Sequence, residues 1–103
     1  MSLDMTAGKN QESINHPEEA ILVLCYQGDE SGDFPELSRL WDEFYDGPRI
    51  DPNRAGRIAE ELRSAIPKIT EELDQSLGDS ALRLADFFHT AFENGSWVHS
   101  VSD

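Results

Sequence analysis

Three oxygen-bearing side chains, Asp29, Ser31 and Asp33, stand at alternate positions, which is the spacing with which a calcium-binding loop begins. The rest of that loop is missing. Phe34 occupies the sixth position, where the sharp turn requires glycine, and Leu40 occupies the twelfth, where a bidentate glutamate is needed. The pattern therefore favours a solvated turn and helix cap over a calcium site.

Other residue types capable of chemistry are present but do not converge. His16, His89 and His99 are far apart in the sequence, and Cys25 lies in an apolar run that disfavours the thiolate. A His89–Asp86 dyad is conceivable, but a helix histidine is the favoured interpretation. Neighbouring acids occur at residues 42–43, 60–61 and 71–72. Adjacent helical side chains diverge by about 100°, so we predict a protein without catalysis, metal or cofactor.

The arginines gather around one segment, at positions 49, 54, 57 and 63, and a phosphate site is one possible interpretation. Acidic residues interleave with them, at positions 51, 60 and 61. Because arginine forms bidentate pairs with carboxylates, ion pairs within the chain and dimer contacts are the favoured interpretation.

The elements that position these residues follow from apolar periodicity and turn residues. Residues 1–17 are polar and predict a flexible tail, and residues 18–103 predict a single domain. The continuous apolar run 20–26 predicts a buried strand. A helix should begin at Asp33, with Glu36 completing a capping box, and should stop at Gly47-Pro48.

A long second helix is expected to begin at Asp51-Pro52, with a kink, or a break between two abutting helices, around 64–66 because Pro67 interrupts it. A third helix should be capped by Asp79 or Ser80 and should end at Asn94-Gly95. Residues 96–102 are rich in strand formers and predict a terminal strand beside the first.

These elements predict an α+β fold, in which a small two- or three-stranded sheet is covered by about three helices, in the order strand, helix, long broken helix, helix, strand. Two strands alone are marginally stable, so either helices should cover the sheet closely or a further strand should extend it, from the tail or from a second copy of the chain. A homodimer is therefore possible.

Charge narrows the class of partner. Twenty-one acidic and eight basic residues give a net charge of −13, which disfavours nucleic acid and anionic membranes and favours a basic protein partner. The single cysteine excludes a disulfide within the chain and is typical of a reducing compartment. No apolar stretch approaches the roughly eighteen residues of a membrane span, so we expect a cytoplasmic protein.

Acidic residues are concentrated between Glu18 and Asp46, where nine of them face one base, Arg39. Solubility alone is one explanation of this bias. The other is an inhibitory binding module that presents carboxylates to the cationic cleft of a partner, for example a nuclease, with Trp41, Tyr45 or Trp97 as anchors if exposed. The predicted contact residues are Asp29, Glu30, Asp33, Glu36, Asp42, Glu43 and Asp46.

Three segments carry a resemblance to a known family: FPELSRLWDEFYDG from Phe34, AEEL at Ala59–Leu62, and ALRLADFFHTAFENG at Ala81–Gly95. Together they resemble small bacterial immunity proteins of polymorphic-toxin systems, of the immunity protein 70 type. The resemblance implies an antagonist of a cognate toxin in a bacterial cytoplasm, without catalysis or cofactor. The alternative that the sequence leaves open is a structural or regulatory homo-oligomer whose self-contact uses the strand near Trp97 and Val101 or the aromatic helix.

Overall fold

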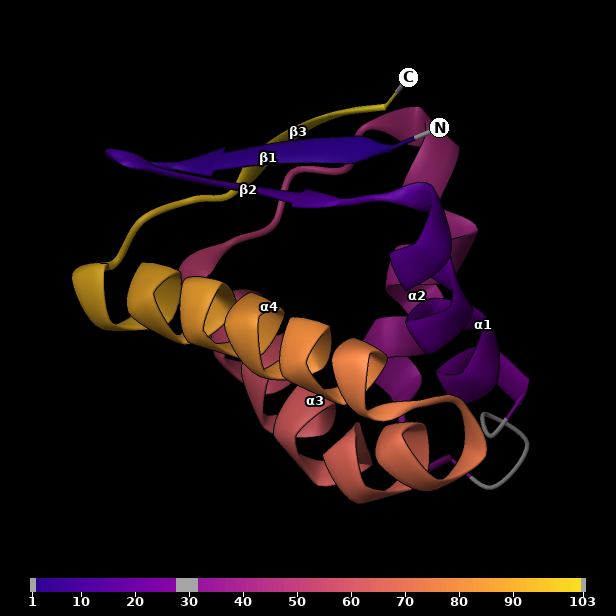
Figure 1. The fold of residues 1–103 in the computed structure, drawn as a ribbon. Helices are drawn as coiled ribbons and strands as arrows, with labels where there is room; N and C mark the ends of the chain where they lie inside the picture. The colour runs from indigo at the N-terminus through magenta and orange to yellow at the C-terminus, as the bar shows by residue number, and fades with distance from the viewer. Residues whose placement is uncertain (1, 28–31, 103) are drawn as a thin grey trace.

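Three antiparallel strands in the order β2-β1-β3 and four α-helices make up the α+β fold over the part of the chain that is described, residues 2–27 and 32–102 of a computed structural model. Figure 1 shows the strands on one side of α4, with α3 beside α4 and with α1 and α2 at one end of that helix pair. The expected α+β class with a small sheet is therefore confirmed, although the strand predicted at residues 20–26 is wrong and two strands lie in the segment predicted as a tail.

The polar segment expected to be a flexible tail forms a β-hairpin instead. β1 (Leu3–Ala7) pairs with β2 (Asn10–Ile14) across a turn in which Gly8 has a φ of 60°. Alternate β1 residues, Leu3, Met5 and Ala7, are buried. The alternation of apolar and polar residues in Leu3–Ala7 is the two-residue period of a half-buried strand, so the prediction of a tail was wrong although this local signal was present.

The apolar run at residues 20–26 is helical, so the predicted first strand is wrong. A short 3₁₀ turn, η1 (His16–Glu18), leads into α1 (Glu19–Gln27). Ile21, Leu22 and Cys25 are buried, whereas Val23 is 36% exposed. A short apolar run fits a buried strand or a buried helix equally well, and here the burial at helical spacing shows which one the chain adopts.

The aromatic segment forms α2 (Pro35–Asp42) and the 3₁₀ turn η3 (Phe44–Asp46), which ends at Gly47 with a φ of 59°. The helix and its glycine stop were expected, but the cap was not found. Phe34 occupies the N-cap position without a side-chain hydrogen bond, and Glu36 turns to other partners. The predicted Asp33–Glu36 capping box is therefore wrong.

Two long helices follow, α3 (Pro52–Glu72) and α4 (Gln75–Asn94). Asp51 caps α3 as expected, by accepting a hydrogen bond from the Arg54 N–H at 2.8 Å. Pro67 lies within α3 on an exposed position and does not divide the helix. Asp74 caps α4, rather than Asp79 or Ser80, by accepting a hydrogen bond from the Leu77 N–H. Gly78 therefore lies inside the helix, where an added Cβ would collide with Thr70 Oγ1.

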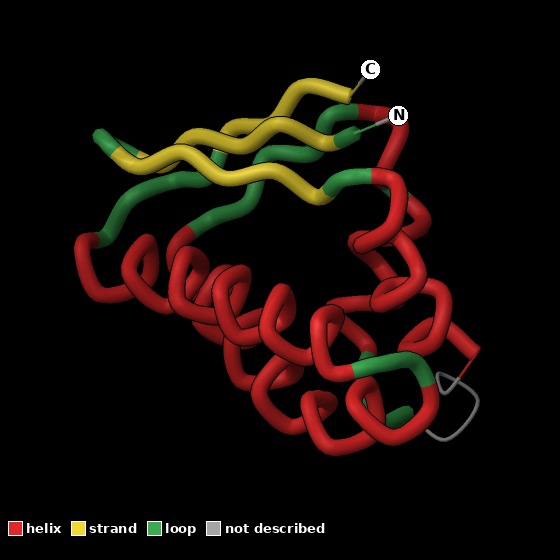
Figure 2. Tube along the Cα trace, in the orientation of Figure 1, coloured by secondary structure: helices red, strands yellow, loops and turns green. Residues whose placement is uncertain are grey.

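The terminal strand was predicted, but its neighbour was not. β3 (His99–Ser102) pairs antiparallel with β1, with Leu3 opposite Ser102, so the two ends of the described chain lie side by side (Figure 2). Ile50 and Val98 add an antiparallel bridge, and the Ser100 hydroxyl donates a hydrogen bond to the Pro48 carbonyl oxygen. These contacts attach the segment after η3 to β3.

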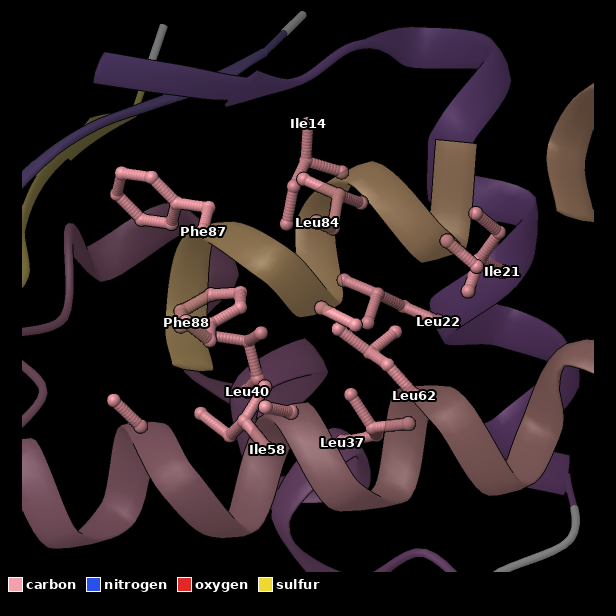
Figure 3. Close-up of a cluster of buried hydrophobic side chains, with 14 of the residues drawn as sticks. Ile14, Ile21, Leu22, Leu37, Leu40, Ile58, Leu62, Leu84, Phe87 and Phe88 are labelled. Carbon is pink, nitrogen blue, oxygen red and sulfur yellow. The ribbon is translucent and has the colours of Figure 1, made fainter. Parts of the chain in front are cut away.

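A single cluster of buried side chains joins sheet and helices. In Figure 3, Ile14 points from β2 into a cluster that also contains Leu84 of α4, Ile58 of α3 and Leu40 of α2. Arg83 of α4 adds ion pairs to Glu18 (2.6 Å) and to Glu12 of β2 (3.0 Å). Within residues 2–27 and 32–102, no helix has the length and apolar character needed to cross a bilayer.

Candidate protein-binding surface

Five of the seven predicted contact acids lie along α2 and η3, and the structure divides them into two groups. Glu36 and Glu43 are partly buried, whereas Asp33, Asp42 and Asp46 are exposed. The remaining two predicted residues, Asp29 and Glu30, lie outside the described residues. The acidic segment is therefore not a uniform surface.

The partly buried acids pair with arginines of α3. Arg54, whose side chain is only 3% exposed, donates from Nε to Glu36 Oε1 at 2.8 Å and from a terminal nitrogen to Glu43 Oε1 at 2.7 Å. Arg57 Nε lies 2.9 Å from the second Glu36 oxygen, and Arg39 lies 3.7 Å from Glu43. Both oxygens of Glu36 are therefore engaged within the chain, so its predicted role as a contact residue has no support in this geometry.

The direction of the pKa shift of Glu36 is consistent with these ion pairs. Burial alone would raise the pKa of Glu36, but the hydrogen bonds and positive charges of Arg57 and Arg54 outweigh it, and the pKa is lowered from its usual value of 4.5. Glu36 is thus held as a carboxylate. Its interaction with Arg54 fixes α2 against α3.

Glu61 caps the N-terminal end of α2. Its carboxylate accepts hydrogen bonds from the backbone N–H groups of Glu36 and Leu37, both at 3.0 Å. Burial raises the pKa of Glu61. These two hydrogen bonds and the positive charge of Arg57 lower it, but they only partly offset the effect of burial. A residue 25 positions away therefore satisfies the N–H groups that the predicted capping box would have served.

Two of the exposed acids, Asp42 and Asp46, lie within three residues of an exposed aromatic residue. Tyr45, between Asp42 and Asp46, is 55% exposed, while the neighbouring Phe44 is completely buried. The Phe44 ring lies 5.4 Å from the Tyr45 ring and 5.4 Å from the Trp41 ring. Tyr45 thus packs against a buried ring and is still accessible to solvent, and both properties are typical of an interface anchor.

All six arginines have partners within the chain. Five form ion pairs with carboxylates, and Arg49 lies over the Trp97 ring at 5.6 Å from its centroid. In contrast, several exposed carboxylates contact no partner among the described residues: Asp33, Asp42, Asp46, Glu60, Glu71 and Glu72. The expectation of ion pairs within the chain is therefore correct, and the uncompensated charge of the described surface is negative.

The candidate groups for catalysis lie apart. Asp86 pairs with Arg63 at 3.3 Å, whereas His89 lies 3.3 Å from Glu93, so the structure shows no His89–Asp86 dyad. Burial raises the pKa of Cys25 to about 11. In the described ranges 2–27 and 32–102, no three His, Cys, Asp or Glu side chains gather as metal ligands.

We name Asp42, Tyr45 and Asp46 the Tyr45 surface, because they combine an exposed ring with two unpaired carboxylates at the end of α2. Sequence reasoning identified all three, but it did not separate them from the paired acids. Comparisons with models of protein families, with curated proteins and with solved structures give no match for this chain. The Tyr45 surface must therefore be interpreted from its own chemistry.

Proposed function

We propose that this chain is an acidic protein-binding module that uses the Tyr45 surface to bind a cationic protein. The observation that carries the proposal is the asymmetry of pairing: the arginines are all engaged within the chain, whereas the exposed Asp42 and Asp46, close in sequence to the exposed Tyr45, have no partner among residues 2–27 and 32–102. A surface that served solubility alone would not require an aromatic ring supported by a buried one.

Such a surface suits rapid and durable association. Uncompensated negative charge attracts a positively charged partner over distances of about the Debye length, roughly 10 Å at 0.1 M salt. After contact, Tyr45 supplies apolar area that desolvates with little loss of side-chain freedom. The ion pairs of Arg54 keep α2 in place, so the surface is formed before binding.

The finer form of the proposal is an immunity-type inhibitor that neutralises a cognate toxin in a bacterial cytoplasm. The family resemblance of α2, α3 and α4 supports it, as does the charge. Nucleases bind the phosphate backbone through cationic clefts, and carboxylates such as Asp42 and Asp46 would compete with those phosphates. This function needs neither catalysis nor a cofactor from the chain.

The test first asks whether a toxin gene adjoins this gene, and then measures binding of the purified toxin domain by stopped-flow mixing at low and high salt. The double variant Asp42→Lys/Asp46→Lys should slow association by about 10-fold or more at low salt and flatten its salt dependence. Tyr45→Ala should leave the association rate near that of the wild type and accelerate dissociation by about 10-fold.

A matched control carries the same change in charge elsewhere. Glu71 and Glu72 are exposed and unpaired among the described residues, at the far end of α3. Glu71→Lys/Glu72→Lys should slow association much less than the variant at the Tyr45 surface. Equal slowing by both variants would show that overall charge, not this surface, guides association.

The second candidate function is a homo-oligomer without catalysis. Two apolar side chains near β3 favour it, since Trp97 is 49% and Val101 67% exposed. Sedimentation velocity at increasing protein concentration decides between the two. A monomer at all concentrations eliminates self-association, and a dimer that is lost in Val101→Lys would support it.

A further inference from the structure

A second feature lies on the helix pair, away from the Tyr45 surface. A pocket of about 170 Å³ opens between α3 and α4. Its walls are formed by Asn53, Gly56, Arg57, Glu60 and Arg63 of α3 and by His89 and Phe92 of α4. Ligand sites for drug-sized molecules occupy about 300–1,000 Å³, so this pocket has room for roughly one side chain.

The apolar wall of the pocket is the aromatic ring of Phe92, which packs against α3. The Phe92 ring packs against Gly56, where an added Cβ would stand 2.8 Å from Phe92 Cδ1. Glycine weakens a helix interior relative to alanine, but here it makes room for the ring. Phe92 nevertheless remains 45% exposed, which leaves part of an aromatic surface open to a ligand.

The arginines of the pocket are already paired. Arg57 lies 2.9 Å from Glu36, and Arg63 lies 3.3 Å from Asp86. His89 lies 3.3 Å from Glu93. An anionic ligand would have to displace one of these carboxylates, so the arginines do not make a phosphate site.

Glu60 is the one carboxylate among the residues lining the pocket, and it contacts no partner within the described chain. With the three paired acids included, four carboxylates stand against three arginines in this region, because Glu36 is shared by Arg54 and Arg57, and the remaining negative charge of Glu60 attracts a cation. A cation that also covers an aromatic ring is best supplied by guanidinium, which is planar and weakly hydrated.

We propose that this pocket binds the guanidinium of an arginine side chain of the partner protein, which stacks on Phe92 and pairs with Glu60. The inference rests on the proposed function for the source of that arginine. The Arg57–Glu36 pair links the pocket wall to α2. Arginine is also among the residues most often found as interface anchors.

The experiment titrates N-acetyl-L-arginine amide into the full ¹⁵N-labelled protein and follows backbone amide shifts by NMR. Saturable shifts should be centred on Gly56–Glu60 and His89–Glu93, with a dissociation constant on the order of millimolar, as expected for one small group. N-acetyl-L-alanine amide should produce no such shifts. Equal shifts from the alanine compound would overturn the proposal.

Variants test the two named contacts. Glu60→Gln and Phe92→Leu should each weaken binding by about 3-fold, whereas Glu72→Gln, an exposed acid outside the pocket, should leave it unchanged. Glu60 is exposed, so its variant is expected to fold, and the amide spectrum verifies this directly. Unaltered binding by Glu60→Gln would contradict the assignment.

Two further titrations separate other ligands. Sodium phosphate should shift these amides less than the arginine compound, and a larger phosphate response would identify an anion site instead. Free L-arginine binding several-fold more tightly than the capped compound would indicate a metabolite site. These probes need no partner protein, so the pocket and the Tyr45 surface are tested separately. Failure of the arginine compound to bind the pocket would not contradict the Tyr45 surface, and failure of the toxin-binding test would not contradict the pocket.

Discussion

Arg54 Nε donates a hydrogen bond to Glu36 Oε1 at 2.8 Å, although the two residues belong to different helices and the arginine side chain is 3% exposed. This pair, with Glu43 as the second acceptor of Arg54, connects α3 to both ends of the α2–η3 segment. The Tyr45 surface therefore depends on a buried charge that itself contacts no partner protein.

We expect Arg54→Met to lower the free energy of unfolding by about 3–5 kcal/mol, because removing one member of a buried ion pair leaves its partners uncompensated. Urea unfolding followed by circular dichroism measures this. Arg63→Met, which breaks the exposed pair with Asp86, should lower it by less than about 1 kcal/mol. Adding Glu36→Gln and Glu43→Gln to Arg54→Met should restore part of the loss; no recovery would show that the arginine acts through packing alone.

The pH dependence of stability should report the Glu36 ion pairs. Because the folded-state pKa of Glu36 lies below 4.5, its contribution is complete well above pH 4.5 and is lost as the pH falls through the lower folded-state pKa. The difference in unfolding free energy between wild type and Glu36→Gln should therefore shrink on acidification from pH 7 to about pH 3. Glu72→Gln should show a constant difference, and the same constancy in Glu36→Gln would contradict the pairing.

Two glycines with similar backbone angles should differ in their response to alanine. Gly47 and Gly95 have φ values of 59° and 64°, so alanine strains the backbone at both, by roughly 1–2 kcal/mol. At Gly47 the added Cβ would also stand 3.0 Å from the Ser100 carbonyl oxygen, whereas nothing lies within 4 Å at Gly95. Thermal unfolding should show a larger loss for Gly47→Ala; equal losses would mean that the segment after η3 moves away from β3 without penalty.

Cys25 should be inert in the folded protein. It is completely buried, and burial raises its pKa to about 11, so little thiolate exists at neutral pH and reagents cannot reach it. Reaction with a disulfide reagent should follow the unfolding transition in urea. In a Cys25→Ala background, Val23→Cys, two residues away on an exposed position, should react without denaturant. Rapid reaction of native Cys25 would disprove its burial.

The sequence by itself determined those elements whose signals are local. The apolar spacing of residues 34–44 predicted α2, Asp51-Pro52 predicted the start of α3, and Asn94-Gly95 predicted the end of α4. Net charge and the absence of chemical motifs directed attention to an acidic protein-binding surface. Each of these depends on neighbours within a few residues, or on composition.

Only the tertiary structure decided the rest, because those contacts join residues far apart in the chain. β1 pairs with β2 in a local hairpin, but its other edge is paired because residues 99–102 return to it. The run 20–26 is a helix because its buried positions, Ile21, Leu22 and Cys25, follow helical spacing against the core. Likewise, Glu36 and Asp42 are both acids on α2, but only Glu36 meets Arg54. Pairing, and not residue type, separates structural carboxylates from those that remain free to bind.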